Sequence, residues 1–339
     1  MIEIIDQAFK AVFGAIGIAI FTIIFGLLYK GIDRKLAAHM QGRVGPPIRQ
    51  PFWDVIKLFS KENIVPEQAI GWLFNLAPVL ALASSITIML YLPIGSFEPI
   101  LSTEGDLILI LYLLMIPSLA MVLGGFASSS PYATVGAQRE MVLMMSYEFP
   151  LAIAIISIVW RLNEANVQNP FSLYSIVSHP IWNNVGILGM IGLTLLLITL
   201  LIVTPGELSK IPFDVPEAET EIAGGLLVEY SGRNLGMFYL ADAVKTVAIA
   251  TIIVTLFFPY NLSPILNLSG YAAYITDFLF YLLKVFLVIL FSVTLIRVGV
   301  ARLKIDQVVS TYWITLTLIG LIGLVLVMFD KVAVSRGLI

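Results

Sequence analysis

Acidic side chains gather in one short segment of this sequence, GELSKIPFDVPEAETEIAGGLLVEYSG at residues 206–232. The segment holds six carboxylates and a single cation, Lys210. Carboxylates held close together share protons and titrate as a coupled set, so the segment could take up and release protons. The six acids are Glu207, Asp214, Glu217, Glu219, Glu221 and Glu229.

Part of this crowding has a simpler local explanation. Pro216 favours the first turn of a helix, and acids near a helix N-terminus complement the helix dipole. A helix starting there would place Glu217 and Glu221 four residues apart on one face, where like charges repel. The preceding IPFDVP resists helix formation and predicts a bent, partly buried path, and Gly224–Gly225 adds flexibility.

Four more charged side chains stand inside long apolar runs: Glu148, Asp242, Lys245 and Lys284. A charge at the centre of a bilayer costs at least about 2.5–3.5 kcal/mol, so we expect these groups to face protein or water. Asp242 and Lys245 could form a static pair on one helix face, and Lys284 could reach an interface by snorkelling. The functional alternative is proton transfer, because buried carboxyl groups and lysines change protonation state readily.

The elements that must position these groups are apolar helices. The chain has 339 residues, of which 59% are hydrophobic and 12% charged, whereas soluble domains carry about 25% charged residues. The apolar runs are continuous, which excludes a β-barrel, and each is long enough to cross a bilayer as a helix. We therefore predict an all-α polytopic membrane protein, one membrane domain over residues 1–339, with eight spans near 8–29, 69–92, 107–127, 141–160, 185–204, 235–258, 274–296 and 308–329.

Two connections stand out between these spans. In the loop 30–68, PFWDVIKLFSKE puts Phe52, Val55, Ile56 and Phe59 at helical spacing. This predicts a short amphipathic helix that begins at Pro51 and lies along the membrane interface. The second connection is the acidic loop 205–234, which we expect to be cytoplasmic or to re-enter the membrane from that side.

The distribution of cations predicts the orientation. Loops 30–68, 128–140, 205–234 and 297–307 alternate to one side, and they carry most of the Lys and Arg residues. The positive-inside rule makes that side cytoplasmic, so both termini of this cell-membrane protein are expected on the external side. The cations on the cytoplasmic side are Lys30, Arg34, Lys35, Arg43, Arg49, Lys57, Lys61, Arg139, Lys210, Arg233, Arg297, Arg302 and Lys304; Lys10, Arg161, Lys331 and Arg336 fall on the other.

Composition also bounds the chemistry. The chain has no cysteine and two histidines, so it lacks the thiolates that hold iron–sulfur clusters, and a metal site is not expected. A net charge of −3 without basic runs argues against nucleic acid as a partner.

Several stretches together resemble one family: RKLAAHMQGRVGP, QPFWDVIKLFSKE, GAQREMVLMMSYE, SKIPFDVPEAETEI, VEYSGR and RVGVARLKIDQ. The chain resembles the heel subunit of respiratory complex I and the matching membrane subunit of group 4 nickel–iron hydrogenases and related archaeal complexes. The resemblance extends over essentially the whole chain, and PFDVPEAE followed by VEYSG is its most specific part.

The resemblance implies a non-catalytic subunit without a redox centre of its own. It would lie in the lipid bilayer, dock cytoplasmic subunits that hold iron–sulfur clusters and a NiFe or other catalytic centre, and pass a signal or proton to antiporter-like membrane subunits. The implied ion-coupling residues are Arg139, Glu140, Glu148, Glu207, Asp214, Glu217, Glu219, Glu221, Glu229, Asp242, Lys245 and Lys284. The implied arm-interface residues are Arg43, Pro46, Asp54, Lys57, Glu62, Arg297, Arg302 and Asp306.

One departure from complex I bears on the reaction. Only Pro47-Ile48-Arg49 separates Gly45-Pro46 from Gln50-Pro51. In quinone-reducing complex I this loop is longer and helps to frame the quinone tunnel. The compact loop and Arg139-Glu140-Met141 resemble the hydrogenase branch, while PEAETEI resembles complex I and archaeal complexes. Together they favour an archaeal membrane-bound hydrogenase or its sulfur-reducing relative, driven by ferredoxin and coupled to translocation of H⁺ or Na⁺.

Three alternatives stay open. The chain could be the quinone-site subunit of an NADH- or F420H2:quinone oxidoreductase. It could be an independent transporter, although the inverted repeat expected of one is not seen. It could also be a structural anchor whose acids bind basic surfaces of its partners.

Overall fold

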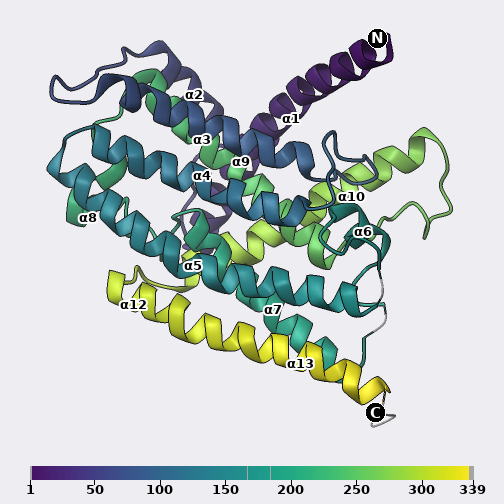
Figure 1. Ribbon diagram of the computed structural model, residues 1–339. Coiled ribbons are helices and arrows are strands. Elements are labelled where there is room, and N and C mark those ends of the chain that lie inside the picture. Colours follow the sequence, from purple (N-terminus) through teal and green to yellow (C-terminus); the bar gives the residue numbers. More distant parts are fainter. Residues whose placement is uncertain (1, 166, 184, 336–339) are drawn as a thin grey trace. The chain divides into compact units, whose positions relative to one another are not determined.

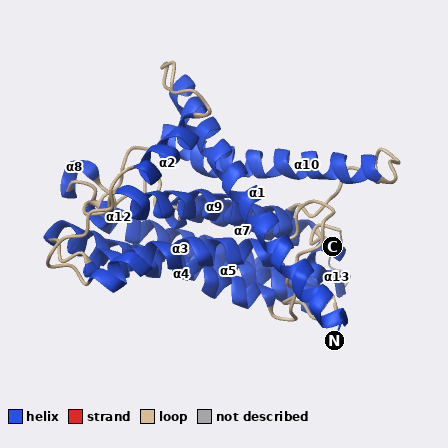
Figure 2. Cartoon of the chain, turned by 90° about the horizontal axis from the view of Figure 1, so that it is seen from above, coloured by secondary structure: helices blue, strands red, loops and turns tan. Residues whose placement is uncertain are grey.

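The computed structural model describes residues 2–165, 167–183 and 185–335, and their side chains between residues 12 and 330 (Figures 1 and 2). Within those ranges the regular structure is helical, and the one β-bridge joins Ile94 and Phe97. The helices are α1 Ile2–Met40, α2 Gln50–Ser60, α3 Gly71–Tyr91, α4 Asp106–Ala127, α5 Pro131–Glu164, α6 Leu173–Ser178, α7 Ile187–Glu207, α8 Glu219–Ile222, η1 Gly225–Leu227, α9 Gly232–Phe257, α10 Tyr271–Ile289, η2 Leu290–Thr294, α11 Leu295–Gly299, α12 Ile305–Ser310, η3 Thr311–Leu316 and α13 Thr317–Ser335.

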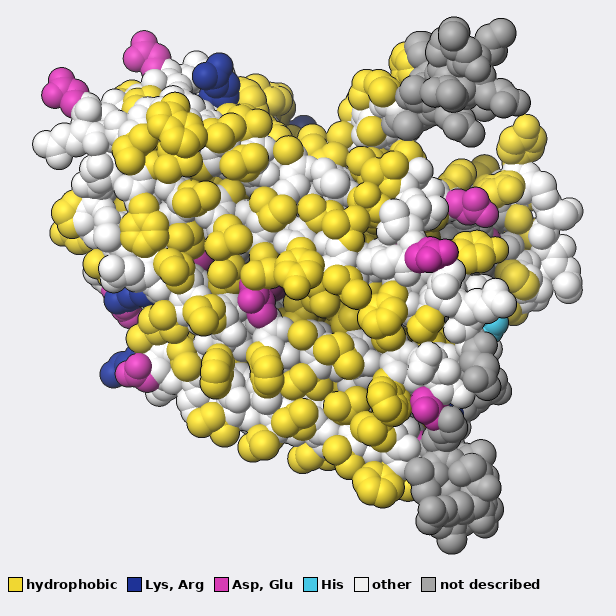
Figure 3. All heavy atoms as spheres, viewed as in Figure 1, with side chains coloured by type: hydrophobic (Ala, Val, Ile, Leu, Met, Phe, Trp, Pro, Cys, Tyr) yellow, Lys and Arg dark blue, Asp and Glu magenta, His cyan; other side chains and the backbone are white. Residues whose placement is uncertain are grey.

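Eight helical stretches in the described chain are long and apolar enough to cross a membrane, which confirms the predicted class and number of spans. Figure 3 shows the apolar side chains that cover these helices on one face. The stretches are Val12–Met40, Gly71–Tyr91, Asp106–Ala127, Pro131–Glu164, Ile187–Glu207, Gly232–Phe257, Tyr271–Gly299 and Ile305–Asp330. The predicted external position of the C-terminus rests partly on Arg336, which lies outside the described residues.

Several predicted loop boundaries were wrong, because helices continue past the ends of the apolar runs. The predicted loop 30–68 begins inside α1, which ends at Met40, and most of the predicted loop 128–140 belongs to α5. Alanine, leucine, lysine, arginine and glutamate are strong helix formers, so a helix can persist where hydropathy falls. The predicted acidic loop 205–234 shortens to residues 208–231, because α7 ends at Glu207 and α9 begins at Gly232.

The amphipathic segment forms a helix as predicted, α2, with Pro51 at its start. Its predicted apolar face was only half right. Phe52 and Val55 pack against a core cluster that includes Leu27, whereas Ile56 and Phe59 are 59% and 47% exposed.

The described residues group into two compact units. Unit 1 comprises residues 1–102, 112–140 and 216–249, and unit 2 comprises residues 103–111, 141–215 and 250–339. The boundaries fall inside α4, α5 and α9. The single membrane domain stays a prediction, and each unit is described by itself below.

The core of unit 1 is built from small and aromatic side chains of α3, α4 and α9. Phe74 stacks on Tyr230, with ring centroids 4.1 Å apart, and Tyr230 meets Phe238 edge-on at 4.9 Å. Ala77 and Ala120 lie in the same cluster. Small residues let helix backbones approach closely, which is how helices associate in lipid without a hydrophobic driving force between them.

In unit 2, α7 packs against α13 through glycines. A Cβ at Gly192 would lie 2.7 Å from the Gly323 carbonyl oxygen, so only glycine fits. Gly206, at the end of α7, lies against the buried ring of Tyr312 in η3. The end of α7, where the acidic segment begins, is therefore fixed by close packing.

Candidate functional site

The acid-rich segment follows an irregular path, as the sequence predicts for IPFDVP. Residues 212–216 are buried without forming a helix. The helix expected from Pro216 onward was misplaced, because α8 covers only Glu219–Ile222. Glu217 precedes that helix, so the predicted stacking of Glu217 and Glu221 on one helix face is wrong.

The backbone ends α8 at once. Ala223 takes a left-handed conformation with φ 54°, and Gly224 and Gly225 follow with φ 95° and 51°. The Leu226 N–H donates to the Pro216 carbonyl oxygen at 3.4 Å, which closes the loop, and a Cβ at Gly225 would collide with that oxygen. Positive φ favours glycine, so the two glycines shape a defined turn.

Arg139 and Glu221, both predicted ion-coupling residues, form an ion pair in unit 1. The Arg139 Nη1 donates to Glu221 Oε2 at 2.6 Å, joining α5 to α8. The Glu221 side chain is 47% exposed, so the pair contributes little to stability, on the order of 1 kcal/mol or less. Glu217 and Glu219 line a shallow pocket of about 470 Å³ beside α8.

The end of the acidic segment is anchored by Tyr230. Its hydroxyl donates to the Phe74 carbonyl oxygen at 3.1 Å. Burial raises the pKa of the Tyr230 hydroxyl, which therefore stays protonated and remains a donor. Gly124 leaves the space that this hydroxyl occupies, because a Cβ there would overlap it.

In unit 2, a predicted arm-interface residue holds a predicted ion-coupling residue. The Arg302 Nε donates to Asp214 Oδ1 at 2.9 Å, and Nη2 donates to Oδ2, so the contact is bidentate. The Leu303 N–H also donates to the Pro212 carbonyl oxygen at 3.1 Å. The loop between α11 and α12 is thereby tied to the buried IPFDVP segment.

Asp242 has a partner that the sequence did not reveal. The Lys30 Nζ lies 2.6 Å from Asp242 Oδ2, donates to the Tyr239 carbonyl oxygen at 3.0 Å and sits 3.8 Å from the Tyr239 ring centroid. Sequence reasoning assigned Lys30 to a loop, although it stands at the end of an apolar run and four residues before Arg34. That spacing places both cations on one face of α1.

The two other lysines within spans donate to neutral groups. The buried Lys245 amine donates to Ser118 Oγ at 3.0 Å. The Lys284 amine donates to the carbonyl oxygens of Phe258 and Tyr260 at 2.9 and 2.8 Å, just beyond the end of α9. Cations near a helix C-terminus stabilise it. The predicted central position of Lys284 was therefore wrong, because it lies level with the end of the neighbouring helix.

The remaining predicted residues are spread over both units. Glu140 and Glu207 are buried, and Glu148 is partly buried. Arg34 of α1 pairs with Asp54 of α2 at 3.1 Å. The others lie as follows: Arg43 and Pro46 in the turn after α1, Lys57 on α2, Glu62 just after α2, Glu229 between η1 and α9, Arg297 on α11 and Asp306 in the first turn of α12.

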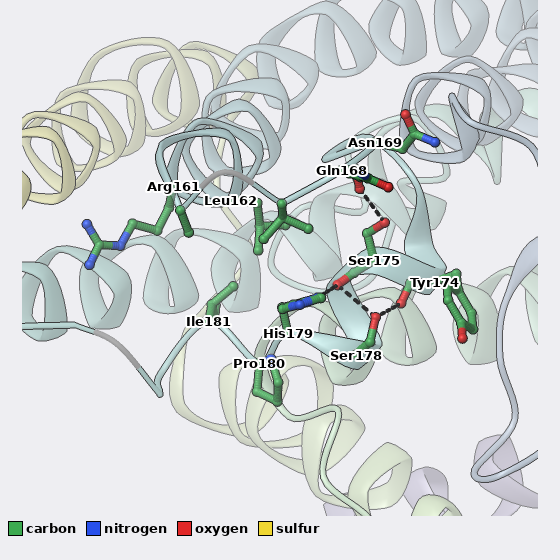
Figure 4. Close-up of a pocket in the computed structure, with 12 residues that line it drawn as sticks. Arg161, Leu162, Gln168, Asn169, Tyr174, Ser175, Ser178, His179, Pro180 and Ile181 are labelled. Atoms are coloured by element: carbon green, nitrogen blue, oxygen red, sulfur yellow. Dashed lines mark hydrogen bonds between the residues drawn. The ribbon is translucent and has the colours of Figure 1, made fainter.

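A pocket of about 580 Å³ in unit 2 is separate from these residues (Figure 4). Its polar lining includes His179, whose Nδ1 lies 3.2 Å from the Ser175 carbonyl oxygen, and Ser175 Oγ donates to the Gln168 carbonyl oxygen at 2.9 Å. No residue predicted for ion coupling or the arm interface lines it. Across the described residues, no group of three or more His, Cys, Asp or Glu side chains could hold a metal ion.

Comparison with known proteins places the chain in a family. The family model for NADH dehydrogenase matches residues 13–328. The chain is 31% identical to a membrane-complex relative from Anoxybacillus flavithermus, a subunit of NADH-quinone oxidoreductase, over 93% of this chain and 92% of that one. It is 30% identical to the corresponding NADH-quinone oxidoreductase subunit of Syntrophotalea carbinolica, over 86% and 87%.

A solved structure is similar over almost the whole chain. It is a chain of the membrane-bound sulfane sulfur reductase, an archaeal respiratory membrane complex, with 29% identity and a TM-score of 0.80 over 94% of this chain and 99% of that one. These findings confirm the resemblance noted in the sequence. The chain belongs to the NADH dehydrogenase family, as its NADH-quinone oxidoreductase relatives do, and it is a multi-pass membrane subunit of an oxidoreductase complex.

Proposed function

We propose that this chain couples electron transfer to ion translocation in a ferredoxin-driven respiratory complex that evolves hydrogen or reduces sulfur species. Electrons flow in cytoplasmic partner subunits, which carry the iron–sulfur clusters and the catalytic centre. This chain converts their arrival into charge movement among its carboxylates and passes it to antiporter-like membrane subunits. The loops that hold Arg43, Lys57 and Arg302 face the cytoplasm and the partner arm, with both termini outside.

The single observation that carries the proposal is the pairing of acids with cations from other elements. Glu221 is held by Arg139, Asp214 by Arg302 and Asp242 by Lys30, each across a long sequence separation. An acid beside a cation favours its charged form, and it gains a proton when the cation moves away. Movement of one element against another therefore changes protonation, which is what a redox-driven ion pump requires.

The choice of acceptor rests on the short loop between Gly45-Pro46 and Gln50-Pro51. In the structure, Gly45 has φ 70° and α2 follows directly at Gln50, so the connection from α1 to α2 is compact. A compact connection leaves little chain to frame a tunnel for a long quinone. The similarity to a chain of the archaeal sulfane sulfur reductase supports the same choice.

A first experiment uses the intact complex purified from native membranes with reduced ferredoxin as the donor. Protons, polysulfide and a soluble quinone are supplied in turn as acceptors. We expect hydrogen or sulfide to form without reduction of the quinone. Rapid quinone reduction that a tunnel-binding inhibitor blocks would refute this choice of acceptor.

A second experiment tests the coupling itself. In the double variant Glu217→Gln/Glu221→Gln, we expect electron transfer to remain measurable while ion translocation into vesicles is abolished. The matched control is Glu67→Gln/Glu98→Gln, which neutralises two exposed acids outside the acidic segment. Full translocation by the first double variant would refute a coupling role for these acids.

The second candidate function is quinone reduction. The curated relatives favour it, because those compared above are subunits of NADH-quinone oxidoreductases. In that case the acceptor assay above would show quinone reduction, and quinone would bind near Arg43 and Pro46.

A further inference from the structure

A strip of alternating charges crosses unit 1 from α2 to the interior of α9. At its outer end, Asp54 of α2 accepts a hydrogen bond from Gln50 Nε2 at 2.9 Å and pairs with Arg34 of α1 at 3.1 Å. At its inner end, Lys30 of α1 pairs with Asp242 of α9 at 2.6 Å. The Lys30 side chain is 10% exposed and that of Arg34 is 35% exposed, so the strip becomes more buried inward.

The ring of Tyr239 joins the two ion pairs. The Lys30 Nζ lies 3.8 Å from the ring centroid and the Arg34 guanidinium carbon lies 5.7 Å from it. A cation within about 6 Å of an aromatic ring centroid is attracted to its face. Both cations are therefore held against one ring, within about one Debye length of each other, ~10 Å at 0.1 M salt.

Two glycines of α1 allow this alignment. A Cβ at Gly26 would lie 2.5 Å from the Ala243 carbonyl oxygen, so α1 touches the backbone of α9 one residue after Asp242. A Cβ at Gly31 would collide with the Ile48 carbonyl oxygen in the connection to α2. Helix α1 is thus pressed against α9 on one side of Lys30 and against the α2 connection on the other.

We propose that Lys30 is the positioning residue that keeps Asp242 ionised, and that Arg34 and Tyr239 transmit the state of Asp54 on α2 to this pair. The inference rests on the proposed function, since it takes Asp242 to be one of the groups whose protonation changes during coupling. It adds the route by which α2, which we expect at the arm junction, reaches a carboxylate inside a span.

The signs of the single changes follow from the order of charges. Removing the Lys30 cation leaves Asp242 without its nearest positive charge and favours the protonated acid. Removing the more distant Arg34 cation acts in the same direction but less strongly. Neutralising Asp54 removes an anion from the strip, so the remaining cations favour ionised Asp242 more.

Other groups around Asp242 must be distinguished from Lys30. Lys245 lies three residues further along α9 and donates to Ser118 of α4, and Glu140 of α5 is buried in the same unit. The variant Lys245→Met therefore serves as the comparison, because it removes a cation on the same helix as Asp242 without touching the strip.

The experiment measures protonation of Asp242 directly in membranes that contain the whole complex. Dicyclohexylcarbodiimide adds to carboxylic acids in their protonated form, and mass spectrometry of the peptide that carries Asp242 quantifies the adduct as a function of pH. An opposite charge within about 4–6 Å shifts a carboxyl titration by about 1–3 units. We expect the labelling midpoint to rise by about that much in Lys30→Met, to stay near that of the native chain in Lys30→Arg, and to fall in Asp54→Asn.

The proposal is overturned if Lys30→Met leaves the labelling midpoint unchanged, if Lys245→Met moves it further than Lys30→Met does, or if Asp54→Asn moves it upward. Lys30→Arg and Asp54→Asn keep the test decisive if the methionine variant fails to assemble, because both are conservative. Ion translocation by Asp242→Asn separates the two levels of inference. Full translocation there would refute the proposed role of Asp242 in coupling, while the labelling shifts would still establish the strip.

Discussion

Replacing Arg302 by methionine removes both donors that hold the Asp214 carboxylate in unit 2. The Asp214 side chain is 12% exposed, so the charge left behind is poorly hydrated, while the Arg302 side chain is 29% exposed. Breaking a fully buried pair costs about 3–5 kcal/mol and an exposed pair at most about 1 kcal/mol. This intermediate pair should therefore contribute about 2 kcal/mol to keeping the loop closed.

Hydrogen exchange at Leu303 reports on this contact, because its N–H donates to the Pro212 carbonyl oxygen on the partner loop. A loss of about 2 kcal/mol in local stability corresponds to roughly 30-fold faster exchange. The measurement is exchange mass spectrometry of the complex, on peptides that cover residues 298–306 in the native chain and in Arg302→Met.

Two further variants identify the cause. Asp214→Asn should accelerate exchange less than Arg302→Met, because the Arg302 head group that it leaves can reach water. The double variant Arg302→Met/Asp214→Asn should exchange more slowly than Arg302→Met alone, since it leaves no unpaired buried charge. Unchanged exchange at Leu303 in Arg302→Met, or additive effects in the double variant, would refute the reasoning.

Three other changes test the packing described above. Gly192→Leu should cost about 3 kcal/mol by forcing α7 away from α13, seen as a lower temperature of thermal inactivation, whereas Gly17→Leu, where a Cβ meets nothing within 4 Å, should be neutral. Tyr230→Phe should lose about 1 kcal/mol with its hydrogen bond to Phe74; because burial raises the pKa of Tyr230, that loss should be constant below its ordinary pKa of about 10 and diminish only above it. Lys284→Met should lose about 2 kcal/mol by leaving two carbonyl groups without their charged donor but should keep the native ratio of ions to electrons, and a stable complex with a reduced ratio would contradict this.

Hydropathy predicted the spans well because a bilayer demands about 20 apolar residues per helix whatever the tertiary contacts. It failed at helix ends, where α1 continues through Lys30 and Arg34 and α5 begins before Arg139. Hydropathy measures solvent preference, whereas the helix end depends on propensity and capping.

Prediction of the site divides in the same way. The identity of the acids could be read from residue type and from the resemblance, and the structure places cations beside Asp214, Glu221 and Asp242. The partner of Asp242 could not be read, because Lys30 is separated from it by more than 200 residues and spacing reports only neighbours on one helix. Likewise the contacts of Lys284 depend on a loop that folds back beyond α9.

That fold-back bears on how the chain enters the membrane during synthesis. An uncompensated lysine raises the cost of inserting a helix by up to about 3.5 kcal/mol. Lys284 meets its acceptors in residues 258–260, which leave the ribosome before α10 does, so α9 and α10 can insert together as a hairpin with the amine already neutralised by hydrogen bonds. Lys30 meets Asp242 only after most of the chain has been made, so α1 must wait near the membrane surface, with its amine hydrated, until α9 arrives to complete the fold.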